Sequence, residues 1–248
     1  MKYFILTIGT GLLLYSSIVV LVYYKQRSLL YLPNENNYLD TKPEFEYDEE
    51  FIEVEQDLFL KSWFIKKDIK KYSTIVFFHG NAGNLFNRAY KLNKLSTLNV
   101  NILIVSWRGF SGNKGRPTEK NLYRDAHKTI DWLKKRGVEN KKIILYGESL
   151  GTGVAVELGQ NNLFKGIILE SPFTSMEILA QKYYPYLPAK IILKDKYKSI
   201  EKINKIKFPM HVMHGKKDNI VPFYMGEEIF NKYDGVKSNY FNDNDDHM

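Results

Sequence analysis

The pentapeptide Gly147-Glu148-Ser149-Leu150-Gly151 is the feature that most constrains how this chain can fold. It has the form G-x-S-x-G and stands between an apolar run, 142–146, and a segment, 151–158, that can continue as a helix. This pattern predicts a sharp turn from a buried parallel strand into a helix, with the serine in a strained backbone conformation. The glycines lack a Cβ, so strand and helix can approach closely. We therefore expect the Ser149 hydroxyl at a helix N-terminus, where the Leu150 amide can face a developing oxyanion.

The rest of the chain alternates apolar runs with segments of helical periodicity. We expect strands at 58–65, 74–78, 101–107, 142–146, 166–169 and 210–213, an edge strand at 236–241, and helices at about 85–98, 119–136 and 151–158. An acidic stretch before residue 57, with aromatic residues among the charges, predicts an exposed antiparallel strand that pairs with 58–65. Such alternation predicts an α/β fold with a mostly parallel central sheet flanked by helices.

The composition excludes several kinds of catalytic and binding site. With 248 residues, 44% of them hydrophobic, the chain is long enough for one sizeable domain. The absence of cysteine excludes a thiol nucleophile and thiolate metal sites. The net charge of +8 is spread along the chain without the basic and aromatic interleaving of a nucleic-acid surface, so we expect no nucleic acid and favour an anionic membrane surface. No metal-binding or nucleotide-binding motif occurs, so no metal and no cofactor is expected.

The N-terminal segment Tyr3–Tyr24 has 22 uncharged, mostly apolar residues. A helix of that length spans about 33 Å, enough for a hydrocarbon core of about 30 Å. A cleaved signal peptide is the alternative, but the apolar run is long for one and no A-x-A-like site follows. We expect a single-pass membrane anchor at 3–24, a linker at 25–43, whose Asn34–Asn37 is polar, and a catalytic domain at 44–248. Basic residues on both sides of the anchor leave the side of the membrane open.

Three further segments follow expected strands in an order that suits acyl transfer. His79–Asn84 follows the strand at 74–78, where a backbone amide can complete an oxyanion hole; Asn81 is the preferred donor and Ala82 the alternative. Asp218 lies in the loop after the strand at 210–213, at the carboxyl edge of the sheet. His247 comes later, so the chain order is serine, acid, histidine.

These segments together resemble the α/β-hydrolase superfamily, and within it the membrane-anchored abhydrolase-domain branch, related to the prolyl oligopeptidase-like serine hydrolases. The resemblance extends from about Gln26 to His247 and rests on His79–Asn84, Arg108–Gly112, Gly115–Glu119, Gly147–Gly151, Ser171–Ser175 and His214–Asp218 with Val221 and Pro222. It implies an α/β-hydrolase fold with a short cap inserted at about 175–207. It also implies Ser149 as nucleophile, His247 as general base and acid, and Asp218 as the residue that orients His247.

Other titratable residues have simpler interpretations. We expect His79 and His214 to be structural, and Arg108 to pair with a carboxylate such as Asp125. Members of this branch usually continue into a final helix, whereas this sequence ends at Met248, as a naturally short or a truncated chain. We therefore expect His247 to be anchored only from its upstream side and to be poorly ordered.

The expected cap contains Tyr183-Tyr184-Pro185-Tyr186-Leu187-Pro188, followed by a lysine-rich stretch. It is either a solvated helix pair or an aromatic acyl-binding wall whose basic rim meets anionic lipid headgroups.

The sequence thus predicts a membrane-anchored serine hydrolase that cleaves carboxylic esters or thioesters through an acyl-enzyme. The resemblance includes protein depalmitoylases, so the expected substrate is an acylated protein or lipid. A serine peptidase or amidase is the alternative among enzymes, and a catalytically inactive, membrane-tethered binding module is the alternative outside them.

Overall fold

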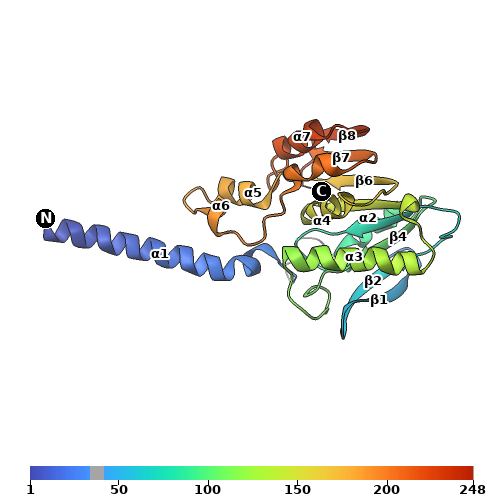
Figure 1. Cartoon of the computed structure of the whole chain (residues 1–248), viewed down its shortest axis with the longest axis horizontal. Coiled ribbons are helices and arrows are strands. Elements are labelled where there is room, and N and C mark those ends of the chain that lie inside the picture. The colour runs from blue at the N-terminus through green and yellow to red at the C-terminus, as the bar shows by residue number, and fades with distance from the viewer. Residues whose placement is uncertain (34–41, 248) are drawn as a thin grey trace.

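The residues that this computed structural model describes, 1–33 and 42–247, form an eight-stranded sheet with helices on both faces, and a long helix projects from one end (Figure 1). The strand order is β1-β2-β4-β3-β5-β6-β7-β8. β2 runs antiparallel to both of its neighbours, and all later neighbours are parallel. The predicted α/β architecture with a mostly parallel sheet is confirmed.

The strands are β1 Asp48–Glu55, β2 Leu58–Ile65, β3 Thr74–Phe78, β4 Asn101–Val105, β5 Ile143–Glu148, β6 Gly166–Glu170, β7 Met210–Gly215 and β8 Lys237–Asn242. The helices are α1 Lys2–Leu30, α2 Ala89–Leu95, α3 Glu119–Lys135, α4 Leu150–Gly159, α5 Met176–Tyr183, α6 Ala189–Ile192 and α7 Phe223–Lys232.

Two predicted elements differ from the structure, and one helix was not predicted. The helix expected at 85–98 is a short 3₁₀ turn, Phe86–Arg88, followed by α2, because the Asn84 side chain accepts the Phe86 N–H and holds the chain in a turn. The strand expected to reach Trp107 ends at Val105, where β4 loses its partner and the Trp107 N–H instead meets the His79 ring. Helix α7 was not predicted at all.

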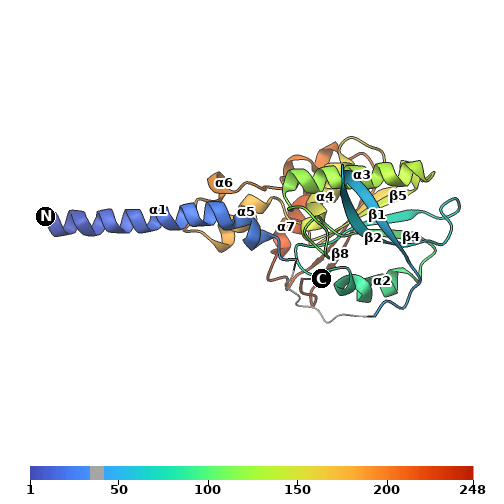
Figure 2. The same cartoon turned by 90° about the horizontal axis from the view of Figure 1, so that it is seen from below.

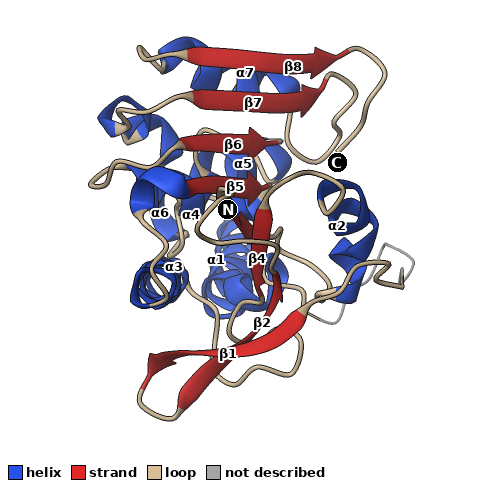
Figure 3. Cartoon of the chain, turned by 90° about the vertical axis from the view of Figure 1, so that its right-hand side faces the viewer, coloured by secondary structure: helices blue, strands red, loops and turns tan. Residues whose placement is uncertain are grey.

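Each face of the sheet has its own buried cluster, because alternate residues of a strand point to opposite faces. Val76, Leu103 and Leu145 pack beneath α3, α4 and α7, whereas Phe77 and Ile104 pack beneath α2 on the other face. Figure 3 shows α2 on the opposite side of the central strands from α3 and α4. Strands covered on both faces have continuous apolar sequences, which explains why the sequence revealed them.

The parallel strands β3, β5 and β7 all end at the same edge of the sheet. The loops that follow them hold residues 79–85, Ser149 and residues 216–222 respectively. The fold therefore brings three segments that are distant in sequence to one edge.

Helix α1 extends well beyond the sheet, and its C-terminal half lies beside α5 and α6 in two perpendicular views (Figures 1 and 2). By length and composition it is a candidate for a membrane-spanning helix. It continues to Leu30, so the linker expected from residue 25 starts too early, because Gln26, Arg27 and Tyr31 form contacts that hold the chain here. The polar linker at Asn34–Asn37 lies outside the described residues.

Candidate active site

The turn from β5 into α4 has the predicted strained form. Ser149 has φ 49° and ψ −113°, a conformation that costs free energy for a residue with a Cβ. A Cβ on Gly151 would collide with the Phe78 carbonyl, and a Cβ on Gly147 would collide with the backbone of Thr152. Glycine is therefore required at both positions, because β3, β5 and α4 meet here without space for a side chain.

The structure brings the three predicted residues together. His247 Nε2 lies 3.2 Å from Ser149 Oγ, and His247 Nδ1 lies 2.7 Å from Asp218 Oδ2. With Asp218 ionised, His247 Nδ1–H donates to the carboxylate, which leaves Nε2 to accept a hydrogen bond from the serine hydroxyl. All three side chains are buried, so bulk water does not compete strongly for these bonds.

Asp218 is held by four donors. Its Oδ1 accepts the backbone N–H groups of Ile220 and Val221, and its Oδ2 accepts His247 and His214, the latter at 3.2 Å. Burial by itself raises the pKa of the Asp218 carboxyl, but the hydrogen bonds from His214 and His247 outweigh it and hold the pKa well below its usual range. The carboxylate is therefore ionised at neutral pH.

The segment that leads to His247 is anchored on its upstream side, as expected, but the expectation that His247 is poorly ordered is wrong, because its ring is buried and contacts both Asp218 and Ser149. The Lys216 and Lys217 N–H groups donate to the carbonyls of Asn242 and Asp245. Gly215 leaves room for this approach, because a Cβ there would meet the Asp245 carbonyl. The loop bearing Asp218 thus also holds the loop bearing His247, whose side chain is only 7% exposed. The nearby Asp243 is exposed and pairs with Lys216, as a solvated loop charge would.

His79 has a structural role, as expected. Its Nδ1–H donates to the Gly80 carbonyl and its Nε2 accepts the Trp107 N–H, so both ring nitrogens are occupied. Burial lowers the pKa of His79 to about 3, which keeps the ring neutral. This ring fixes the start of the loop that contains Asn81 and Ala82.

That loop lies directly against the serine turn. A Cβ built on Gly80 would come within 3.7 Å of Ser149 Cβ. The Asn81 carbonyl accepts the Leu32 N–H, and the Asn81 side-chain amide donates to the Leu30 carbonyl. Leu150 is the first residue of α4, and the first N–H groups of a helix have no acceptor within that helix. The two predicted oxyanion donors thus come from segments on either side of Ser149.

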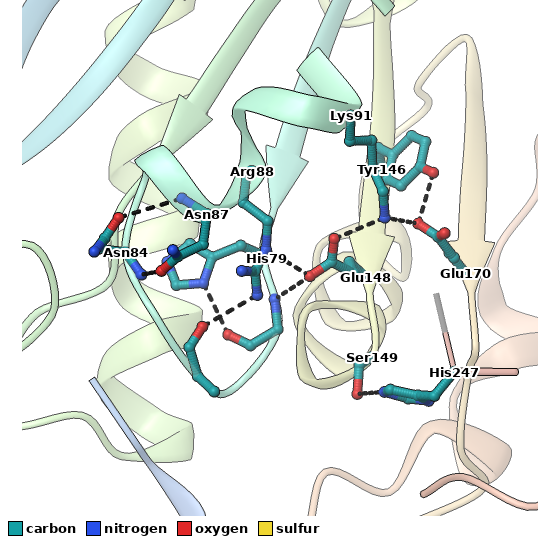
Figure 4. Close-up of polar contacts among 12 residues, drawn as sticks. His79, Asn84, Asn87, Arg88, Lys91, Tyr146, Glu148, Ser149, Glu170 and His247 are labelled. Atoms are coloured by element: carbon teal, nitrogen blue, oxygen red, sulfur yellow. Dashed lines mark hydrogen bonds and ion pairs between the residues drawn. The ribbon is translucent and has the colours of Figure 1, made fainter. Parts of the chain in front are cut away.

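A buried charge cluster that the sequence did not predict lies next to this site (Figure 4). Glu148 Oε1 accepts the Gly80 N–H at 3.1 Å and Arg88 Nε at 2.8 Å, and an Arg88 terminal nitrogen donates to the Ala82 carbonyl. Burial raises the pKa of the Glu148 carboxyl, but Arg88 and Lys91 lower it well below its usual range. Glu148 and Arg88 therefore clamp the 79–82 loop to the serine turn.

The cluster continues through Lys91 to the next strand. Lys91 Nζ lies 2.8 Å from Glu148 Oε2 and 2.6 Å from Glu170 Oε2, which also accepts the Tyr146 hydroxyl at 2.7 Å. The only signal in the sequence was the presence of charged residues at the ends of apolar strands. Arg108, by contrast, was predicted to pair with Asp125 and does so, with Glu55 as a second partner.

Within residues 1–33 and 42–247, no group of three or more histidine and acidic side chains is arranged to hold a metal ion. The arrangement is suited instead to general base catalysis by an imidazole on a serine hydroxyl.

The chain is similar to several known proteins in sequence and in fold. Residues 70–199 match the family described as serine aminopeptidase, S33. An uncharacterized protein of Mycobacterium tuberculosis is 32% identical over 217 residues, which cover 86% of this chain and 77% of that protein. The human alpha/beta hydrolase domain-containing protein 17B is 34% identical over 167 residues, which cover 64% of this chain and 54% of that protein. The lysophosphatidylserine lipase of Danio rerio is 31% identical over 68% of this chain and 49% of its own length.

Among solved structures, an esterase from Pyrococcus furiosus superposes with a TM-score of 0.67 and 21% identity, covering 88% of this chain and 90% of the esterase. An acylaminoacyl peptidase from Pyrococcus horikoshii gives a TM-score of 0.65 at 19% identity, over 82% of this chain and 37% of the peptidase. These two structural similarities establish the fold. The match of residues 70–199 establishes the family. The chain belongs to the serine aminopeptidase S33 family, within the abhydrolase-domain branch of the α/β-hydrolase superfamily.

Proposed function

We propose that this protein is a membrane-anchored serine hydrolase that cleaves carboxylic esters or thioesters through an acyl-enzyme. The observation that carries the proposal is the continuous contact from Asp218 through His247 to Ser149, at 2.7 and 3.2 Å, on a strained turn. In this assignment residues 3–24 are the anchor, 44–248 the catalytic domain and about 175–207 the cap. Proteins named esterase and lipase among the relatives and structural neighbours support ester chemistry.

In the first half-reaction, Ser149 Oγ attacks the carbonyl carbon while its proton passes to His247 Nε2. Asp218 stabilises the resulting imidazolium, because it stays ionised and accepts His247 Nδ1–H. The backbone amides of Leu150 and Asn81, with Ala82 as the alternative to Asn81, stabilise the oxyanion. Collapse of the tetrahedral intermediate breaks the bond to the alcohol or thiol, which takes the proton from His247.

In the second half-reaction, water attacks the acyl carbon as His247 accepts its proton. The acid is released when Ser149 regains its proton from His247. No further group is required, because the reaction is a transfer of the acyl group from the substrate to water.

Amide hydrolysis is the second candidate. The matching family is described as serine aminopeptidase, and one structural neighbour is an acylaminoacyl peptidase. The same residues would serve, with His247 protonating an amine. Measuring kcat/KM for p-nitrophenyl esters and for aminoacyl p-nitroanilides with the same acyl groups distinguishes an esterase from a peptidase. A peptidase should hydrolyse the anilides efficiently.

The proposal is tested by Ser149→Ala. Hydrolysis of p-nitrophenyl butyrate should fall by at least about 10³-fold, because the covalent route is lost while binding and oxyanion contacts remain. The wild type should be labelled by a fluorophosphonate probe and the variant should not.

Retention of most activity in Ser149→Ala would exclude this nucleophile. A wild-type protein that neither reacts with the probe nor hydrolyses any ester would instead indicate an inactive, membrane-tethered binding module.

A further inference from the structure

A mostly apolar cavity of about 380 Å³ lies between α1 and the segment that follows β6. Its walls include Val22 and Leu30 from α1, Leu179 and Ala180 from α5, and Ile220 from the loop after β7. Ligand sites in proteins commonly have volumes of about 300–1,000 Å³. No charged side chain is among the described residues that line it, which disfavours a headgroup or a peptide as its occupant.

Helix α1 is fixed against this segment by polar contacts near one end of the cavity. The Gln26 side chain donates to the Ile192 carbonyl at 3.1 Å and accepts the Lys194 N–H at 2.7 Å. Arg27 forms two hydrogen bonds with the buried Asp195 carboxylate, at 2.8 and 3.1 Å. A bidentate pair with one buried partner fixes both position and angle. The helix wall of the cavity is therefore preorganised.

The same contacts indicate how deep the cap lies in a bilayer. Lys194 Nζ lies 3.9 Å from the centroid of the Tyr23 ring, and both residue types favour the headgroup level. The Tyr15 hydroxyl donates to the Tyr186 carbonyl at 2.9 Å. Tyr15 precedes Tyr23 by eight residues, or about 12 Å along a helix. With Tyr23 at the headgroups, Tyr186 lies within the hydrocarbon.

The backbone between α5 and α6 is suited to that depth. The carbonyls of Tyr184, Pro185, Tyr186 and Leu187 all accept hydrogen bonds, several of them from the Gln181 side chain. Backbone groups at hydrocarbon depth must be satisfied internally because lipid offers no partners. The side chains of Tyr184, Tyr186 and Ile191 are exposed, and Ile191 is 82% exposed. This surface is costly in water and favourable in lipid.

Residues that line the cavity also form hydrogen bonds with the loops of the candidate active site. At one end, the Leu30 carbonyl accepts the Asn81 side-chain amide at 2.8 Å. At the other, the Tyr183 hydroxyl donates to the Asn219 carbonyl, and the adjacent Ile220 N–H donates to Asp218. Residues that line the cavity thus contact both the loop with the proposed oxyanion donor and the loop with the proposed acid.

We infer that this cavity binds the fatty acyl chain of the substrate, which enters from the bilayer, and that the anchor helix itself forms one wall. The inference rests on the proposed ester or thioester hydrolysis and adds the substrate class, a membrane-borne fatty acyl ester or thioester. The anchor therefore contributes to chain-length selectivity as well as to location.

The test fills the cavity from its two opposite walls, with Val22→Trp on α1 and Ala180→Phe on α5, in the full chain in detergent micelles. For each variant, kcat/KM is measured for p-nitrophenyl butyrate and p-nitrophenyl palmitate. We expect the palmitate to butyrate ratio to fall at least about tenfold, the loss for roughly two methylene groups that are no longer buried. Leu21→Trp is the matched control, because Leu21 neighbours Val22 but is 60% exposed, and its ratio should be unchanged.

A binding measurement separates this inference from the proposed function. Displacement of the fluorescent fatty acid cis-parinaric acid by palmitate should be seen with Ser149→Ala and lost in Ser149→Ala combined with Val22→Trp. If no ester is hydrolysed but this pattern holds, the proposed function fails and the acyl site stands. If esters are hydrolysed but both filling variants leave the ratio and the binding unchanged, or Leu21→Trp changes them equally, the acyl site is refuted. A variant that loses butyrate turnover as well is judged by the binding result alone.

Discussion

Two histidines contact the Asp218 carboxylate, but they differ in their second partner. His247 Nε2 reaches Ser149, whereas His214 Nε2 is shared between Asp218 and the Val221 carbonyl. Gly226 packs so closely on His214 that a Cβ would clash with the ring. The geometry supports a proton-transfer role for His247 and a positioning role for His214.

This difference predicts different losses on substitution. His247→Ala should reduce kcat for p-nitrophenyl butyrate about as much as Ser149→Ala, since a serine hydroxyl is a weak nucleophile without its base. His214→Ala removes one of four donors to Asp218 and should cost about 10- to 100-fold, through misplacement of the acid. Rates and fluorophosphonate labelling are measured together. Full activity in His247→Ala, with loss in His214→Ala, would reverse the assignment.

At the scale of elements, the Glu148 cluster joins β5, the loop after β3 and α2. Glu148 and Arg88 have side chains 0% and 2% exposed, so their charges are stable only as a pair. Through Gly80 and Ala82 this pair fixes the loop that contains the proposed oxyanion donor. Glu148, the variable residue before the serine of G-x-S-x-G, thus positions the loop that follows β3.

Glu148→Gln should therefore lower kcat about 10- to 100-fold with little change in KM, because the oxyanion loop is displaced while the acyl site is not. It should also lower the free energy of unfolding by about 3–5 kcal/mol, because Arg88 and Lys91 lose a buried counter-charge. Glu157→Gln is the matched control, since it breaks an ion pair of α4 with Lys202 that has no contact with that loop. Equal kcat losses in both variants would contradict the clamp.

The contribution of Glu148 to the free energy of unfolding should depend on pH. The Glu148 pKa is lower in the folded protein than in the unfolded chain, so ionised Glu148 stabilises the fold above the unfolded pKa of about 4.3. That contribution is lost as the pH falls toward the folded pKa. The difference in unfolding free energy between wild type and Glu148→Gln should be constant from neutral pH to about 5 and shrink below about 4.

At the scale of the whole molecule, α1 and the cap form one unit. Arg27, Gln26 and Tyr31 hold α1 to the segment at 192–197, and Tyr15 reaches Tyr186. A helix that only tethered a domain would need none of these contacts. In the proposed membrane-anchored protein, these contacts would hold the candidate active site at a fixed distance from the membrane surface.

Deleting Met1–Tyr24 tests this unit. The full chain should stay in membranes through alkaline carbonate extraction, as a spanning helix does, whereas the truncated protein should be extracted. The truncated protein keeps Arg27 and its contacts, so p-nitrophenyl butyrate should still be hydrolysed, but it lacks Val22, so palmitate turnover should fall. Resistance of the truncated protein to carbonate would show that the cap alone is enough for integration.

The sequence by itself determined the α/β class, the serine turn, most strands and the order of the three predicted site residues. These features are encoded locally: a buried strand needs a short apolar run, and the turn at Ser149 needs glycine at 147 because the Thr152 backbone approaches there. Boundaries were less predictable, because the end of β4 and the start of α2 depend on His79 and Asn84 contacts.

Only the tertiary structure decided which distant groups meet. Glu148 is paired with Arg88 and Lys91, 60 and 57 residues away, because β3 lies beside β5 in the sheet. Asp195 meets Arg27 across 168 residues, because the chain after β6 returns to α1. Pairings of this kind carry no local pattern, since any buried carboxylate needs a partner but its sequence does not say which one. The clamp on the 79–82 loop and the cavity beside α1 therefore depended on the fold.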